Sequence, residues 1–252
     1  MKHRSLIVGV PTLFTSLNLF CGFFSVIQSA TGNFTSAAWL IFLAGIFDAL
    51  DGRIARASGL SSPFGLQMDS LSDLISAGLA PALLVYQFHL RFLDPIGLLL
   101  AFLPLLFAAF RLARFNLYTL HDGKRRDYIG LPAPMAGVAL ASTVLFYQVT
   151  EWTVLLRLLT ILVPLVSILM TTTIKFSGFP RFTFRQKGAN LFRLVFFITV
   201  IFSSFFAPEH TFFIATMIYL LSGPVGAVLA YFRNEDDEIT IFLTDDKANS
   251  KE

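Results

Sequence analysis

The chain alternates between long apolar runs and short clusters of polar residues. The runs are roughly 17–25 residues long, the length that an α-helix needs to cross the hydrocarbon core of a bilayer. Because the apolar residues are continuous within a run and do not alternate with period two, the pattern predicts helices rather than the strands of a β-barrel. Eight runs fit this description, and they are the predicted membrane spans: 7–29, 36–56, 67–88, 95–115, 131–149, 153–173, 191–206 and 211–232.

The composition is that of a membrane protein. Of the 252 residues, 55% are hydrophobic, 14% are charged and 29 are phenylalanine, and the mean hydropathy is +0.71. A soluble domain carries about a quarter charged residues, so this class is excluded. We expect an all-α, polytopic transmembrane helical bundle that is surrounded by membrane lipids and has no nucleic-acid partner.

The basic residues fall almost entirely on one side of the predicted membrane. With the N-terminus in the cytoplasm, all of the 19 Lys and Arg residues except Arg91 and Arg157 lie on the cytoplasmic side. Cytoplasmic loops of membrane proteins carry such an excess. The bias predicts an integral protein of the cytoplasmic (inner) membrane with an even number of spans and both termini in the cytoplasm.

The last residues differ in composition from the rest of the chain. Residues 234–252, NEDDEITIFLTDDKANSKE, are polar and acidic around a short apolar island. A segment of this kind buries too little apolar surface to fold on its own. We therefore expect a membrane domain over 1–233 and a disordered, acidic cytoplasmic tail over 234–252.

Four aspartates interrupt the apolar pattern at the cytoplasmic boundary. Asp48 and Asp51 lie in the last turns of the second predicted span, and Asp69 and Asp73 lie in the first turns of the third. Residues three or four apart share a helix face, and two helices joined by a short loop pack antiparallel. We expect the two pairs of carboxylates to face each other at the cytoplasmic end of the bundle.

Carboxylates gathered in this way predict a site for divalent cations. Unpaired, they would repel one another, and acidic residues within a membrane are costly. Oxygen ligands without Cys or His suit magnesium, manganese or calcium rather than zinc, and four carboxylates suffice for two ions. As an alternative, the aspartates pair with Arg53 and Arg56 and cap helix ends, but two arginines cannot neutralise four aspartates. A cation transporter is the second alternative, although it would place the carboxylates near the bilayer midplane.

The segment that holds the aspartates reads Asp48-x2-Asp51-Gly52-x2-Ala55-Arg56-x8-Gly65-x3-Asp69-x3-Asp73. This pattern resembles the signature of the CDP-alcohol phosphatidyltransferase family at every fixed position. Members transfer a phosphatidyl group from a CDP-linked lipid to an alcohol and release CMP. A pyrophosphate under attack develops charge that two metal ions neutralise, and the alcohol needs a base to take its proton.

The resemblance implies a role for each residue of the signature. Asp48, Asp51 and Asp69 would hold two Mg²⁺ or Mn²⁺ ions, and Asp73 would share one ion and act as the general base. Gly52, Ala55 and Gly65 are small and would leave room for the CDP-lipid. The side chain of Arg56 would contact phosphate. The family also implies a homodimer.

Other segments resemble the phosphatidylserine synthase branch of this family. In PTLFTSLNLFCGFFS (11–25), Thr15 and Asn18 would approach the nucleotide, although such residues also serve helix packing. GLPAPMAG (130–137) and YLLSGPVGA (219–227) resemble the same branch.

The segment FRLARFN (110–116) bears on the acceptor, with Arg111 and Arg114 one turn apart and Asn116 after them. Arginine binds a carboxylate in bidentate fashion, which suits free serine; ordinary anchoring at the cytoplasmic boundary is the alternative. We expect a transferase that converts CDP-diacylglycerol and L-serine to phosphatidylserine and CMP. Glycerol 3-phosphate or inositol phosphate as the acceptor, and an ether lipid as the donor, stay open.

Overall fold

The computed structural model describes residues 2–58, 63–122, 130–174, 176, 199–200 and 202–249, and their regular structure is helical throughout. The chain begins with two long helices, α1 (Lys2–Ala30) and α2 (Phe34–Ser58), which pack along each other. The next span is divided into α3 (Pro63–Asp73), a π-helix η1 (Leu74–Leu79) and α4 (Ala80–Phe88). A short 3-10 helix, η2 (Leu90–Leu93), leads into the second half of the chain, which contains α5 (Asp94–Asp122), α6 (Ala133–Thr150), α7 (Val154–Thr171) and α9 (Pro208–Asn249).

Within the described residues, seven helical segments are long and apolar enough to cross a membrane. They confirm seven of the eight predicted spans, and the fold is the expected all-α membrane bundle. The remaining prediction, 191–206, lies for most of its length outside the described residues. The seven segments are Leu13–Ala30, Phe34–Ile54, Phe64–Phe88, Leu90–Leu117, Ala133–Thr150, Val154–Thr171 and Pro208–Val228.

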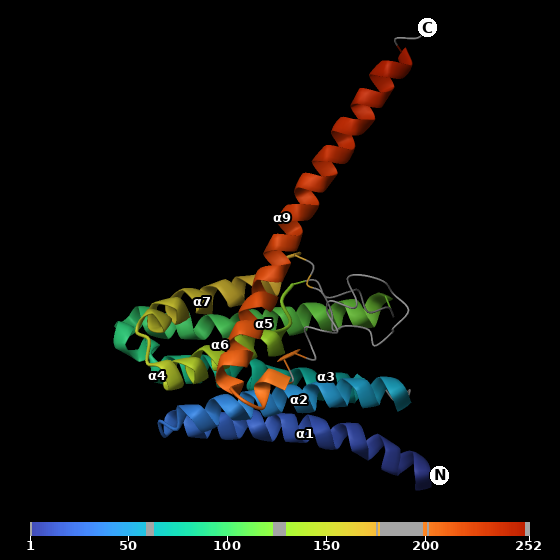
Figure 1. The fold of residues 1–252 in the computed structure, drawn as a ribbon. Helices are drawn as coiled ribbons and strands as arrows, with labels where there is room; N and C mark the ends of the chain where they lie inside the picture. The colour runs from blue at the N-terminus through green and yellow to red at the C-terminus, as the bar shows by residue number, and fades with distance from the viewer. Residues whose placement is uncertain are drawn as a thin grey trace.

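The bundle is built around α6. This helix packs against α2, α4, α7 and α9, and 61% of its span is buried, the largest share among the seven described spans. Small residues such as Ala136, Ala139 and Ala141 line it and let the surrounding helices come close. In Figure 1, α1 and α2 lie on one side of α6, and α5 and α7 lie on the other.

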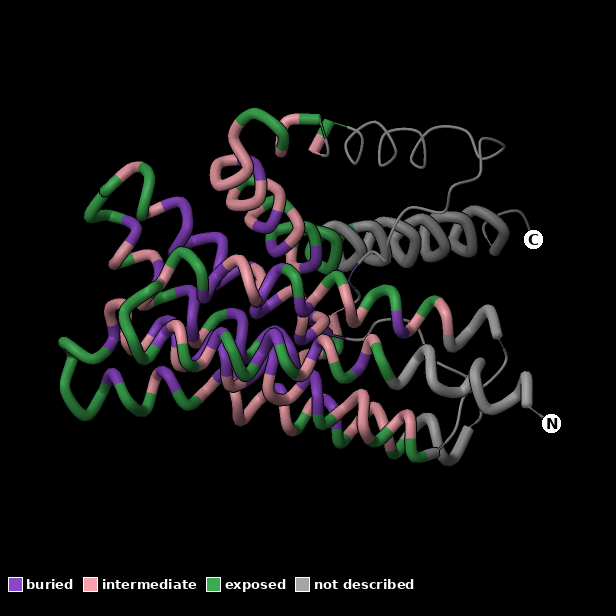
Figure 2. Tube along the Cα trace, turned by 90° about the horizontal axis from the view of Figure 1, so that it is seen from below, coloured by how far each residue is buried: buried purple, intermediate pink, exposed green. Residues whose placement is uncertain are grey.

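Large apolar side chains point outward from the bundle. Figure 2 shows buried residues in the interior and exposed residues along the outer faces of the helices. In water such a surface would be costly, whereas in a bilayer it contacts lipid chains. The described residues of this kind include Phe20, Phe23, Leu98, Leu99, Phe102, Ile161, Ile168 and Ile214.

A glycine turn fixes the start of α6 beside the end of α7. Gly130 has φ +81°, and its backbone N–H donates to the carbonyl of Ile174 at 2.9 Å. A Cβ at this position would lie 2.5 Å from the carbonyl oxygen of Met170. Leu131 N–H donates to the carbonyl of Leu169 at 2.9 Å. The conformation and the close approach both require glycine here.

The last helix differs from the expectation for the tail. α9 continues to Asn249 and so includes residues 234–249, for which we expected disorder. Residues 234–249 contain neither proline nor glycine, the two residues that most disfavour a helix. Figure 1 shows this part of α9 projecting away from the bundle. The division into a membrane domain and a tail stays a prediction.

Candidate active site

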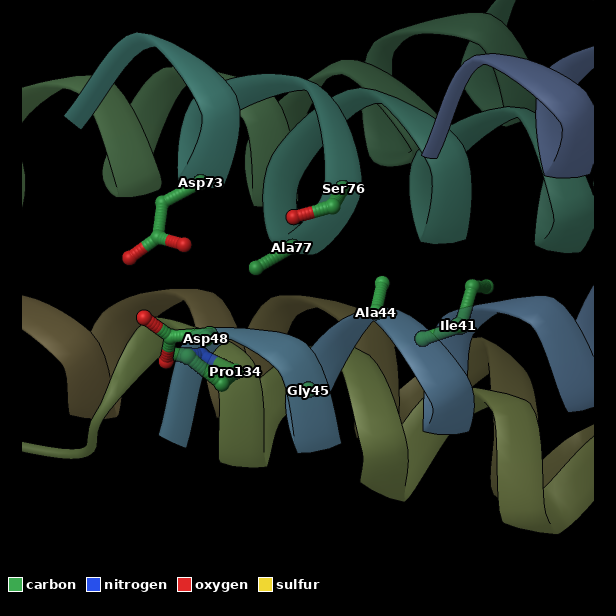
Figure 3. Close-up of a pocket in the computed structure, with 8 residues that line it drawn as sticks. All are labelled: Ile41, Ala44, Gly45, Asp48, Asp73, Ser76, Ala77 and Pro134. Atoms are coloured by element: carbon green, nitrogen blue, oxygen red, sulfur yellow. The ribbon is translucent and has the colours of Figure 1, made fainter. Parts of the chain in front are cut away.

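The predicted aspartates lie on two facing segments at one end of the bundle. Asp48 and Asp51 are carried by the second half of α2, and Asp69 and Asp73 by α3. The helix spacing of 3.6 residues per turn keeps each pair within about one turn on its helix. Figure 3 shows Asp48 and Asp73 directed toward each other across the space between the two segments.

Three of the four carboxylates form one cluster. Asp48, Asp69 and Asp73 each offer an oxygen, and these oxygens all lie within 4.8 Å of one another. Ligands at about 2.1–2.6 Å from a single hard cation can span such a separation. Asp73 is buried, with 7% of its surface exposed, and three negative charges this close need a compensating cation. The donor set therefore fits a divalent metal ion.

Asp51 is outside this cluster. Its carboxylate accepts a hydrogen bond from the Thr15 hydroxyl of α1, and it is 5% exposed. Three residues rotate an α-helix by about 300°, so Asp48 and Asp51 point in directions about 60° apart. This offset lets α1 reach Asp51 while Asp48 faces α3. A role for Asp51 as a metal ligand stays a prediction.

A small cavity adjoins the cluster. Its walls combine the carboxylates of Asp48 and Asp73 with small or apolar residues of α2, η1 and α6, as Figure 3 shows. The π-helix begins directly after Asp73, and π-helical turns are frequent at functional sites. The lining residues are Ile41, Ala44, Gly45, Asp48, Asp73, Ser76, Ala77 and Pro134.

The first helix touches the site through a row of polar groups. Asn18 donates from Nδ2 to Asp73 Oδ1 at 3.0 Å, and Ser72 donates from Oγ to the Thr15 carbonyl at 3.0 Å. Thr15 and Asn18 are 4% and 1% exposed. The side chains predicted to approach the nucleotide are thus bonded to the aspartates themselves.

The predicted acceptor residues of α5 have three different environments. Arg111 interacts electrostatically with the charged groups of Asp73, Asp48 and Arg114 and with the phenol of Tyr219. Its Nε has no hydrogen-bond partner in the described part of the chain. Arg114 instead donates from a terminal nitrogen to the Thr171 carbonyl of α7 at 3.0 Å. Asn116 donates from Nδ2 to Ser70 Oγ of α3 at 3.0 Å. Arg111 is thus the one of the three that is placed next to the acidic cluster by its electrostatic interactions with Asp48 and Asp73.

The remaining residues of the signature are placed by the helices that carry them. Gly52 and Gly65 are half-buried, on α2 and α3 respectively. Ala55 and Arg56 belong to the last turns of α2, and their side chains lie outside the described part.

Sequence reasoning missed several neighbours of the site. Ser72 bonds α1 beside Asp73, Ser76 lines the cavity with Asp73, and Pro134 and Tyr219 come from distant parts of the chain. The spacing of three residues between Asp73 and Ser76 was a usable signal for Ser76. Pro134 and Tyr219 lie in the segments 130–137 and 219–227 noted above, but their place beside the site depends on tertiary packing.

The fold and the site define an integral membrane protein with a cluster of carboxylates suited to a divalent cation and an arginine beside it. A family profile described as CDP-alcohol phosphatidyltransferase matches residues 8–177. The chain belongs to this family. Its members are transferases, which answers the alternative of a cation transporter.

Curated relatives extend over most of the chain. It is 33% identical over 218 residues to the CDP-diacylglycerol–serine O-phosphatidyltransferase of Helicobacter pylori, covering 84% of this chain and 88% of the relative. A protein of the same description from Methanocaldococcus jannaschii is 33% identical over 174 residues, 69% of this chain and 76% of that one. The archaetidylserine synthase of Methanothermobacter thermautotrophicus is 39% identical over 143 residues, 56% and 60% of the two chains.

Proposed function

We propose that the protein is a CDP-diacylglycerol–serine O-phosphatidyltransferase, which forms phosphatidylserine and CMP from CDP-diacylglycerol and L-serine. The observation that carries the proposal is the carboxylate cluster of Asp48, Asp69 and Asp73, with oxygens within 4.8 Å of one another, beside Arg111. Relatives that match most of the chain bear this name. The site therefore has the groups that the reaction needs, and the relatives indicate the acceptor.

We assign the metal to the acidic cluster. Asp48, Asp69 and Asp73 would hold Mg²⁺ or Mn²⁺, and Asp51, on the same helix as Asp48, would contribute to a second ion. When bound, such ions neutralise the charge of the pyrophosphate as its bond to CMP breaks. Hard carboxylate oxygens favour these metals over zinc.

Asp73 is the proposed general base. The serine hydroxyl oxygen attacks the phosphorus of the phosphatidyl group, the bond from that phosphorus to the CMP oxygen breaks, and the hydroxyl proton passes to a carboxylate. Asp73 suits this role because it is buried, held by Asn18 and directed into the cavity. A positioned base of this kind contributes about 10²–10⁴-fold to rate.

The substrates divide between two sides of the cluster. Gly52, Ala55 and Gly65 would leave space for the CDP head, and Arg56 would contact phosphate. Thr15 and Asn18 reach the cluster from α1 through their bonds to Asp51 and Asp73. For the acceptor we propose Arg111 as the residue that binds the serine carboxylate, because its guanidinium is half-buried next to the carboxylates. Arg114 and Asn116 support this wall through their bonds to α7 and α3.

We further propose that the site faces the cytoplasm of an inner-membrane protein, as the distribution of Lys and Arg predicts. A homodimer is the assembly that the family implies. The span of α9, at 22% the least buried of the seven described spans, offers an apolar face for a second copy or for lipid. Mass measurement of the detergent-solubilised protein tests the dimer.

The direct test is CMP release by the purified protein in detergent with CDP-diacylglycerol and Mn²⁺ or Mg²⁺. L-serine, glycerol 3-phosphate, inositol phosphate and no acceptor are compared, and CDP-archaeol replaces the donor in a parallel series, since one relative is an archaetidylserine synthase. We expect release that depends on L-serine and is lost in Asp73→Asn. Asp94→Asn is the matched control, because Asp94 begins α5, away from the cluster. Release with another acceptor only would overturn the assignment of serine.

A further inference from the structure

One face of α1 contacts the segment that carries Asp73. Thr15, Asn18 and Gly22 recur at helical spacing on this face, and each meets α3 or η1. Asn18 makes the central contact, in which its Nδ2 donates to Asp73 Oδ1 at 3.0 Å. The amide is therefore bonded directly to the carboxylate of the proposed base.

The contact between the two segments is fixed by backbone packing on both sides of Asn18. At Gly22, one turn further along α1, a Cβ would lie 2.7 Å from the Cα of Ser76. At Thr15, one turn earlier, the carbonyl accepts a hydrogen bond from Ser72 Oγ at 3.0 Å. Asn18 lies between these two contacts, so the close packing of the two segments sets its distance to Asp73.

The other half of the Asn18 amide makes no contribution to stability. Asn18 is 1% exposed, and its Oδ1 has no hydrogen-bond partner among the described residues. An unpaired buried acceptor is destabilising, and an apolar side chain of the same shape is often tolerated equally well. An asparagine at this position is therefore better explained by what its donor does to Asp73 than by the stability of the bundle.

We infer that Asn18 is a positioning residue, which holds the Asp73 carboxylate in the cluster with Asp48 and Asp69 instead of contacting the nucleotide. The inference rests on the proposed metal site. A hydrogen bond from a neighbouring residue fixes which oxygen of a metal-binding carboxylate faces the cluster, and losing such a bond typically costs 10–100-fold in metal affinity or activity. The bond to Asn18 holds Asp73 Oδ1, and it therefore restricts the rotation of the carboxylate that contributes an oxygen to the cluster.

The first test is Mn²⁺ binding to the substrate-free protein, followed by electron paramagnetic resonance. Asn18→Leu keeps the approximate shape and removes the donor, and Asn18→Ala removes the same donor without adding bulk. We expect both variants to bind Mn²⁺ about 10–100-fold more weakly than wild type. The melting temperature of Asn18→Leu should be unchanged. Ser25→Ala is the matched control, because Ser25 is a buried polar residue of α1 that bonds the Ala37 carbonyl at 2.8 Å, away from the site.

Kinetics distinguish positioning from substrate contact. Positioning predicts a lower kcat with the KM for CDP-diacylglycerol within about threefold of wild type. An unchanged Mn²⁺ affinity with a raised KM for CDP-diacylglycerol would place Asn18 on the nucleotide and overturn the inference. An equal loss of Mn²⁺ affinity in Ser25→Ala would also overturn the inference, because it would show that any loosening of α1 weakens metal binding. Because the Mn²⁺ titration contains neither substrate, failure of the serine reaction in wild type would contradict the proposed function alone.

Discussion

Arg111 and Arg114 are one turn apart on α5, yet their surroundings predict different roles. Arg111 is half-buried among Asp73, Asp48 and Tyr219, whereas Arg114 bonds the Thr171 carbonyl of α7. We predict that Arg111→Met raises the KM for L-serine about 10- to 100-fold, since a hydrogen bond to a charged group contributes about 1.5–3 kcal/mol. Serine-dependent CMP release at saturating CDP-diacylglycerol measures the change.

Arg114→Met is the partner variant of this comparison. It removes the hydrogen bond to α7, so we expect a lower melting temperature and a KM for L-serine within about threefold of wild type. If Arg114→Met raised the KM and Arg111→Met did not, the acceptor would be bound by Arg114, and Arg111 would only balance the charge of the aspartates.

At the residue scale, the sequence predicted which side chains carry the chemistry better than how they are bonded. Helical spacing within α2 and α3, with antiparallel packing across their short loop, predicted that Asp48, Asp69 and Asp73 meet, but the same rule also placed Asp51 with them, and Asp51 lies outside the cluster. The partners of Asp51 and Asp73, which are Thr15 and Asn18, come from α1. Their contacts depend on how a third helix packs, and local spacing carries no information about that.

The contact of α1 with η1 leads to a prediction at the scale of elements. A Cβ at Gly22 would meet the Ser76 Cα at 2.7 Å and its nitrogen at 3.0 Å. Since the obstacle is backbone, Gly22→Ala forces the two helices apart. We expect a loss of about 1–3 kcal/mol in the free energy of unfolding, the usual cost of overpacking, together with reduced CMP release. Thermal unfolding in detergent detects the first effect.

Gly226→Ala is the control for this substitution, because it makes the same chemical change within a helix. Nothing lies within 4 Å of a Cβ built at Gly226, so the higher helix propensity of alanine should leave the melting temperature unchanged or slightly raised. Equal destabilisation by the two variants would mean that the close contact between α1 and η1 is not the cause.

The elements themselves were predictable only in part. Apolar run length located the spans, because it follows directly from bilayer thickness. It did not predict that the span 67–88 contains a π-helix at Leu74–Leu79. The segment LISAGL is rich in small residues that pack on other helices, with Gly78 against Ala108 and Gly137 of α6 against Ala77. A π-turn of this kind is selected by tertiary contacts, which a single apolar run does not reveal.

The molecule as a whole should depend on its metal for stability as well as activity. Without a cation, the clustered carboxylates of Asp48, Asp69 and Asp73 repel one another inside the bundle. We predict that EDTA abolishes CMP release and lowers the melting temperature, and that excess Mn²⁺ or Mg²⁺ restores both. At 100 times its Kd, a bound ion contributes about 2.7 kcal/mol. Full activity in EDTA would contradict the metal site. Asp48→Asn should reduce the change in melting temperature that EDTA causes.

The number of crossings decides whether the two termini lie on the same side of the membrane. Seven spans lie in the described residues, and an odd number would put the termini on opposite sides. Phe176 contacts Tyr219, in the second half of the α9 span. The start of α9 lies elsewhere, because His210, just after Pro208, contacts Phe146 near the C-terminal end of α6. Phe176 thus lies at the end of the bundle that carries the site and Pro208 at the opposite end, and the predicted span 191–206 lies for most of its length outside the described residues; both termini on one side stays a prediction.

Cysteine labelling tests this topology, because Cys21 is the only cysteine in the sequence and is 4% exposed. In a Cys21→Ala background, we predict that a membrane-impermeant maleimide labels Asn33→Cys and Thr153→Cys in intact spheroplasts. Both positions are exposed links at the end opposite to the aspartates. Lys247→Cys should react only after the membrane is opened. Labelling of Lys247→Cys in intact spheroplasts, alongside the two links, would rule out an even number of spans with a cytoplasmic N-terminus. The aspartates, at the same end as the N-terminus, face the cytoplasm only if that terminus does.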